Sequence, residues 1–301
     1  GVSYYRGSTT YAVTSSDGGA TFAAASKVES IPDYEGFPID AVCEGGRYYV
    51  LSQWSGGSPE LQPYPMFCAS GNIGSGFDSV VTVADDMEIN AHDQHFEHKL
   101  AVAGNRVHVI WTGTPAGGSR TTLVRSSGDG GATFGAPVAL DLPDGHGPRN
   151  GLQTVAAMGE HAHVFVLDQT DNAIDAFSSA NGGASFGSAM RVSAPQEGGW
   201  WMQAMADPLD ASGQTVHVLW NSSGYAKTTD GGDTWSGPVR IAVAGQWANT
   251  YPQDPQLAIG AGGVVHHACL GVIPAALPDG GGADVDVFYT RWSPPPPLPA
   301  N

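Results

Sequence analysis

The densest group of side chains able to do chemistry lies in one short segment, residues 92–98. It places three imidazoles beside two carboxylates, in the order His92, Asp93, His95, Glu97 and His98. Imidazole and carboxylate suit Zn²⁺, Cu²⁺ or Ni²⁺, and either group can act as a general base. Because the spacing is not that of a helical metal motif, a solvent-exposed loop is the alternative interpretation. His92, His95 and His98 are therefore candidate metal ligands, and a divalent metal ion is the candidate cofactor.

Aromatic side chains gather in other polar segments that also hold acidic residues. Exposed rings stack on the apolar faces of sugars and bury a large area at a low entropy cost, although packing inside the protein would use the same residues. The candidate ligand-binding residues are Trp200, Trp201, Trp247, Tyr251, Glu197, Asp33 and Tyr34.

The elements that must position these residues are built from a repeat. Four turns share a hydroxyl residue, an Asp or Asn, two glycines, a second hydroxyl residue and an aromatic. Asp or Asn accepts hydrogen bonds from the amides of the turn that it begins, and the glycines supply positive φ. The later turns follow one another at about 50 residues, and the first two turns lie about twice as far apart. A degenerate copy of the turn at residues 70–77 lies between those two, so the period is about 50 residues throughout. The four turns are centred on Asp17, Asp129, Asn181 and Asp230.

Each turn lies at the same place in a larger unit. A strand-like run precedes it, another follows it, and two more lie upstream, which gives four strands, A to D, in each unit. The sequence therefore predicts an all-β protein, a β-propeller of four-stranded antiparallel blades. Six blades are predicted, with five as the alternative, and terminal strands are expected to close the ring. The expected units are residues 38–85, 95–141, 149–194, 199–243 and 252–293, with residues 1–30 as a partial unit.

The turns resemble the Asp box, also called the BNR repeat, Ser/Thr-x-Asp-x-Gly-x-Thr-Trp/Phe, of the sialidase-like superfamily. The resemblance covers nearly the whole chain and rests on the boxes. It implies that the boxes lie in the C–D turns, whereas the D–A and B–C connections line a binding face and an axial cavity. The candidate residues named above lie in such D–A connections or at their ends, on loops held by a rigid scaffold.

Two further sets of residues recur at fixed strand positions. Rings at one strand-B position are predicted to pack between blades, each buried histidine needing one hydrogen-bond partner. Polar residues near the start of strand A are expected to face the channel. They would either line a water-filled channel or bind a polar ligand at its base. The strand-B set is Tyr49, His108, His163, His217 and His266, and the strand-A set is His98, Gln153, Gln203 and Gln256.

Sialidases require three arginines to clamp a carboxylate, and this sequence does not supply them. Arg149 is the only arginine that falls clearly in a D–A connection, and the shared repeat does not carry the activity with it. Propeller polysaccharide lyases use His and Tyr as base and acid, with Arg or a metal neutralising the uronate. By that resemblance His95, His146, Arg149 and Tyr251 are the candidate catalytic residues.

Composition limits the partners. The net charge is −17, with 12 Lys and Arg against 29 Asp and Glu, which argues against a nucleic-acid partner. No apolar run approaches the length of a membrane span. A Cys43–Cys68 bond stays open as a hypothesis, with Cys269 a buried thiol. Residues 1–293 are expected to form one propeller domain, and residues 294–301 a proline-rich tail that suggests a further domain.

The main functional hypothesis is a secreted or cell-surface binding module that holds a glycan, or another small polar ligand, at the D–A loop face. The alternative is a carbohydrate-active enzyme on the same face, either a glycoside hydrolase or a polysaccharide lyase, and the sequence leaves open whether the protein is catalytic. A second alternative is a metal-binding surface protein that uses residues 92–98. The expected location is extracellular, at the cell surface or periplasmic.

Overall fold

The computed structural model describes residues 2–6, 9–27, 36–54, 65–84, 98–114, 118–143, 145–199, 201–220, 224–241, 253–273 and 284–293. Within these ranges the strands form six antiparallel sheets, four with four strands and two with three. The four-stranded sheets are β4 to β7 (Gly36–Glu44, Arg47–Trp54, Met66–Asn72, Phe77–Ala84), β8 to β11 (Lys99–Ala103, Arg106–Gly113, Thr121–Ser127, Val138–Leu140), β12 to β15 (Pro148–Met158, His161–Asp168, Ala173–Ser179, Met190–Arg191) and β16 to β19 (Met202–Ala206, Val216–Trp220, Gly224–Thr228, Val239–Arg240). The end sheets are β1 to β3 (Val2–Arg6, Thr9–Val13, Ser26–Lys27) and β20 to β22 (Gln253–Gly260, Val264–Ile273, Asp284–Trp292), the latter with the short 3₁₀ helix η1 (Ala261–Gly263).

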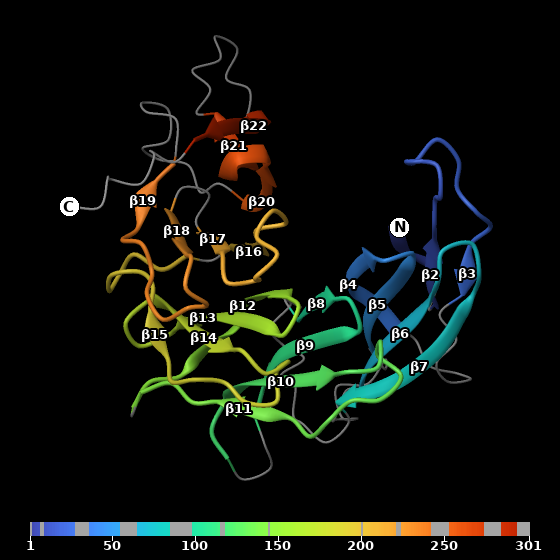
Figure 1. Ribbon diagram of the computed structural model, residues 1–301, viewed down its shortest axis with the longest axis horizontal. Helices are drawn as coiled ribbons and strands as arrows, with labels where there is room; N and C mark the ends of the chain where they lie inside the picture. The colour runs from blue at the N-terminus through green and yellow to red at the C-terminus, as the bar shows by residue number, and fades with distance from the viewer. Residues whose placement is uncertain are drawn as a thin grey trace.

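The sheets follow one another around a common centre, and the first strands of five of them, β4, β8, β12, β16 and β20, lie innermost (Figure 1). This arrangement confirms the predicted all-β propeller of antiparallel blades. The terminal strands are expected to close the ring by pairing with each other. The described strands of the two end sheets instead pair only within their own sheets. No helix in the described ranges is long and apolar enough to cross a membrane.

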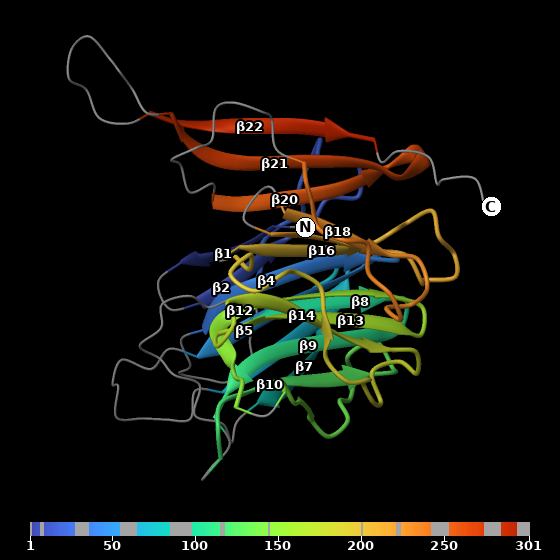
Figure 2. The ribbon, with the colours of Figure 1, turned by 90° about the vertical axis from the view of Figure 1, so that its left-hand side faces the viewer.

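The strands of successive sheets lie across the view in Figure 2, so their connections gather at two opposite ends of the molecule. In a sheet of sequential antiparallel strands the first and third turns share one end, and the second turn shares the other end with the connection to the next sheet. We call the end that holds the second turn and the connection to the next sheet the loop end. In the four-stranded sheets the repeat turns lie between the third and fourth strands, for example between β10 and β11, and therefore lie away from the loop end. In the first sheet, which has three described strands, the turn around Asp17 lies between β2 and β3.

The four repeat turns share one hydrogen-bond pattern. Ser127 Oγ donates to Asp129 Oδ1 over 2.7 Å and accepts from the Gly131 amide. The carboxylate of Asp129 in turn accepts from the amide and the hydroxyl of Thr133, and these bonds lower the pKa of Asp129 to about 2. Gly130 and Gly131 have φ values of 73° and 82°. The same contacts recur around Asp17 and Asp230. Asn181 accepts from the Ser185 amide in the same way, but its Nδ2 donates to Ser185 Oγ.

The apolar core lies between neighbouring sheets rather than at the centre of the ring. Phe165 and Leu167 of β13 belong to one buried cluster with Val218 and Trp220 of β17. Alternation along each strand sends every second side chain into such a layer. This packing fixes the spacing of the inner strands, and so fixes the space that they enclose.

The strand-B rings are structural, as predicted. His108 and His163 are fully buried, and each ring pairs with a serine of the adjacent third strand, His108 Nδ1 with Ser126 Oγ at 2.9 Å and His163 Nδ1 with Ser178 Oγ at 3.0 Å. The second glycine of the next sheet's repeat turn packs directly on this pair, as Gly183 does on His108 and Ser126. We call this contact the inter-sheet joint.

None of the three cysteines forms a disulfide bond. Cys43 is exposed on β4 and Cys68 is buried on β6, and β5 lies between these two strands, so the sulfurs do not meet. Cys269 is buried, as expected.

Candidate functional site

The inner strands enclose a cavity of about 400 Å³. Its wall takes residues from five sheets, because β4, β8, β12, β16 and β20 all lie beside it. Register shifts interrupt the pairing just before Asp40 on β4 and Gln256 on β20, and such bulges re-aim the side chains that follow them. The polar and aromatic residues of the wall are Asp40, Lys99, Thr154, Trp201, Gln203 and Gln256.

Asp40 is the one carboxyl group in the described wall of this cavity. Its Oδ2 accepts a hydrogen bond from the Leu100 amide over 2.9 Å, which ties β4 to β8, and Oδ1 accepts from the Ala41 amide. Burial raises the pKa of Asp40, against the opposing effects of Lys99 and these two amides. A carboxyl with a raised pKa in a polar cavity is suited to donate a proton.

Two of the four strand-A residues expected at the channel line this cavity, Gln203 and Gln256. The other two lie behind the wall, because adjacent residues of a strand point to opposite sides. Gln153 is buried and accepts a hydrogen bond from Thr112 Oγ1 over 2.9 Å. His98 is buried, neither of its ring nitrogens is hydrogen-bonded to a described residue, and burial lowers its pKa to about 4.

The loop candidates divide between described and undescribed parts of the chain. Trp201 lies in the cavity wall, whereas the side chain of Glu197 is exposed and its backbone carbonyl accepts from Trp220 Nε1 at 2.7 Å. Arg149 lies at the start of β12 and is not among the described residues of the wall. The candidates outside the described residues are His92, His95, Trp200, Trp247, Tyr251, Asp33 and Tyr34.

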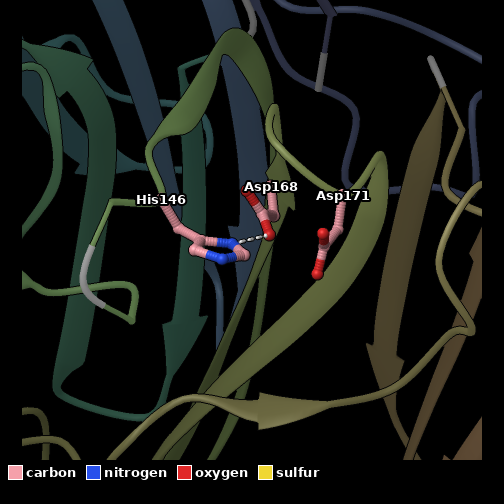
Figure 3. Close-up of side chains that lie close together, drawn as sticks. All are labelled: His146, Asp168 and Asp171. Atoms are coloured by element: carbon pink, nitrogen blue, oxygen red, sulfur yellow. Dashed lines mark hydrogen bonds and ion pairs between the residues drawn. The ribbon is translucent and has the colours of Figure 1, made fainter.

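A second group of titratable residues lies at the loop end of the sheet β12 to β15. His146 precedes β12, Asp168 ends β13, and Asp171 lies in the turn from β13 to β14. His146 Nδ1 and Asp168 Oδ2 are 2.6 Å apart, with the Asp171 carboxylate beside them (Figure 3). The hydrogen bond to Asp168 raises the pKa of His146.

Arg191 on β15 organises the carboxylates of this group. Its Nε contacts Asp175 Oδ1 at 2.8 Å, Nη1 contacts Asp171 at 2.9 Å, and Nη2 contacts Asp168 at 3.3 Å. Asp175 is buried, which raises the pKa of its carboxyl group although Arg191 opposes the shift. We call His146, Asp168, Asp171, Asp175 and Arg191 the His146 cluster.

Sequence reasoning identified His146 but missed its partners, and it missed Asp40 and Lys99. A signal was present in each case. Asp40 is a charged residue among the apolar residues 39, 41 and 42, and Asp168 follows the apolar run of residues 164–167. Such residues were not singled out because nothing local shows which end of a strand meets which loop.

No family model and no curated protein matches the sequence. Solved structures do match. A GH93 α-L-arabinofuranosidase of Fusarium graminearum, in complex with arabinobiose, aligns with a TM-score of 0.56 and 14% identity, over 94% of this chain and 85% of that one. A PL25 ulvan lyase aligns at 0.53 with 12% identity, over 84% and 68%.

A Trypanosoma rangeli sialidase in complex with the inhibitor DANA aligns at 0.50 with 11% identity, over 94% of this chain and 50% of that one. At these identities the likeness concerns the fold. The chain is a β-propeller of the kind found in these carbohydrate-active enzymes.

Proposed function

We propose that this protein is a carbohydrate-active enzyme, a glycoside hydrolase or polysaccharide lyase, that takes a glycan segment into the axial cavity. The observation that carries the proposal is the Asp40 carboxyl in the wall of a cavity of about 400 Å³, which Trp201 and two amide side chains also line. Carbohydrate pockets combine such a ring with a few converging polar groups. The enzymes named above share this fold, which raises the catalytic alternative over a binding module alone.

In the proposed reaction Asp40 transfers the proton. In its neutral form the carboxyl donates to the oxygen of the bond being cleaved, and its burial keeps that form available. The ammonium group of Lys99 supplies positive charge for an acidic sugar or for charge developing in the transition state. The side chains of Gln203 and Gln256 and the ring of Trp201 hold the sugar.

The proposal differs from a sialidase. No arginine lies in the described wall of the cavity, where Lys99 is the one cation, so the carboxylate clamp that sialidases need is missing from that part of the chain. We also propose that the repeat turns are Asp boxes with a purely structural role, and that the protein works extracellularly, at the cell surface or in the periplasm.

Replacing Asp40 by Asn should lower kcat roughly 100-fold or more on the substrate that the protein turns over, because it removes the transferable proton and keeps the side-chain shape. Activity is found by screening aryl glycosides, arabinan, sialosides and ulvan for reducing ends and for the 235 nm absorbance of unsaturated uronates. Glu44→Gln is the matched control. Glu44 also lies on β4 and accepts from a backbone amide beyond the sheet, that of Gly104 over 2.7 Å, but it lies outside the cavity.

Equal activity of Asp40→Asn and Glu44→Gln would overturn the role of Asp40. If the wild-type protein binds glycans but does not turn them over, the protein is a binding module and not an enzyme. In that case Trp201→Ala should weaken binding, because the ring supplies the stacking surface.

A further inference from the structure

The His146 cluster carries more negative charge than its own cation balances. Three carboxylates, those of Asp168, Asp171 and Asp175, face the single guanidinium of Arg191. With His146 neutral and the three carboxyl groups ionised, which are the forms that bind a metal ion, the net charge is three negative less one positive, or −2. Two of these carboxylates, Asp168 and Asp175, are buried, and buried negative charge is costly unless a cation compensates it.

The ligand atoms of three residues are already close together. One ring nitrogen of His146 and one carboxylate oxygen each of Asp168 and Asp171 lie within 4.8 Å of one another. Around Zn²⁺, ligand atoms at about 2.0–2.2 Å from the metal lie roughly 3.4 Å apart in tetrahedral geometry. The 2.6 Å contact between His146 and Asp168 would have to lengthen by roughly 0.8 Å, and separations of up to 4.8 Å would have to shorten by up to about 1.4 Å.

A second observation concerns the same network of side chains. Asp175 has a side chain only 3% exposed, and its Oδ2 has no hydrogen-bond partner in the part of the chain that the structure describes. Buried carboxylate oxygens normally have a partner, so this atom marks an interaction that the described residues do not supply. The other oxygen of Asp175 bonds Arg191, and the same guanidinium bonds Asp168 and Asp171, so the orphaned atom belongs to the same network.

We propose that His146, Asp168 and Asp171 bind a divalent transition metal ion, Zn²⁺ in preference to Ca²⁺. One imidazole nitrogen and two carboxylate oxygens form a three-ligand set that Zn²⁺ accepts, with water completing the coordination, whereas Ca²⁺ requires six or more oxygens. Arg191 holds the two carboxylates in place, as groups behind metal ligands commonly do.

An ion can reach the cluster from solvent. The side chain of Asp168 is fully buried, whereas those of His146 and Asp171 are 23% and 36% exposed, so the site opens toward solvent on one side. The site lies at the loop end, on residues different from those that line the axial cavity. Zinc binding therefore does not depend on the proposed enzymatic activity.

The test is calorimetric titration of the full chain, without a histidine tag and after chelator treatment, with ZnCl₂ and separately with CaCl₂. We expect one Zn²⁺ per chain, with the Kd raised at least about tenfold in both Asp171→Asn and His146→Gln and little heat with Ca²⁺. Asp233→Asn is the matched control, because Asp233 is an exposed acid in a repeat turn far from the loop end. Near-ultraviolet circular dichroism verifies that each variant is folded.

The location of the ion gives an independent measurement. Crystals soaked in ZnCl₂ should show an anomalous peak at the zinc edge between His146 and Asp171. Absence of binding to the wild type would overturn the proposal, and so would unchanged affinity in both variants, which would place the zinc elsewhere, as at residues 92–98. A peak at the cluster that disappears in His146→Gln would support it.

Discussion

Replacing Gly183 by Ala should destabilise the protein by roughly 2–5 kcal/mol, a large fraction of the stability of a folded domain. Gly183 has a φ of 79°, which costs an alanine about 1–2 kcal/mol. A Cβ at this position would also overlap Ser126 Oγ and lie 2.8 Å from His108 Nδ1, and overpacking of this kind adds about 1–3 kcal/mol. Urea unfolding followed by fluorescence measures the loss.

The equivalent glycine of the preceding sheet provides the control. Gly131 has a φ of 82°, but its nearest neighbour is a ring carbon of Tyr49 at 3.7 Å, an ordinary contact. Gly131→Ala should therefore cost only the backbone strain, about 1–2 kcal/mol. The double change Gly183→Ala with Ser126→Ala should recover part of the loss, since it removes the overlapping hydroxyl. Equal losses in Gly131→Ala and Gly183→Ala would show that the inter-sheet joint is not tightly packed.

Acid should destabilise the protein well above the pH range in which the repeat-turn aspartates titrate. Burial lowers the pKa of both His108 and His163 from 6.5 to about 4. Above pH 6.5 both histidines are neutral in the folded and unfolded states, so they add no pH dependence. Between pH 6.5 and 4 these histidines are protonated in the unfolded chain but stay neutral in the folded protein. The free energy of unfolding therefore falls by up to about 1.4 kcal/mol per pH unit for each histidine.

Urea unfolding at intervals between pH 8 and pH 4 measures this slope. The slope measures how many protons the chain takes up when it unfolds. His108→Gln and His163→Gln should each lower that number by about one, and the double variant should lower it by about two. The repeat-turn aspartates act in a separate window, because the folded pKa of Asp129 is about 2 and its contribution is lost only as pH falls below 3.8. A slope that neither histidine change alters would contradict the expected burial cost.

The sequence by itself determined the features that repeat. The turns around Asp129 and Asn181 form as expected, because each uses hydrogen bonds that close within seven residues. The buried rings at His108 and His163 follow from their equivalent positions on the second strands of their units, where they pair with Ala101 and Ala156. A period of about 50 residues with four strands in each unit led to the propeller, because no single unit could bury its apolar faces without neighbours.

Only the tertiary structure decided which residues share a site. The cavity joins Asp40, Lys99 and Gln256 from three sheets, and a bulge before two of them sets their direction, a one-residue effect that the sequence pattern does not show. The His146 cluster joins a loop, a turn and an outer strand, and the side chains of Asp168 and Arg191 meet only because β13, β14 and β15 pair in one register. Periodicity specifies local hydrogen bonds and buried faces, whereas a site depends on long-range register, and no local pattern encodes it.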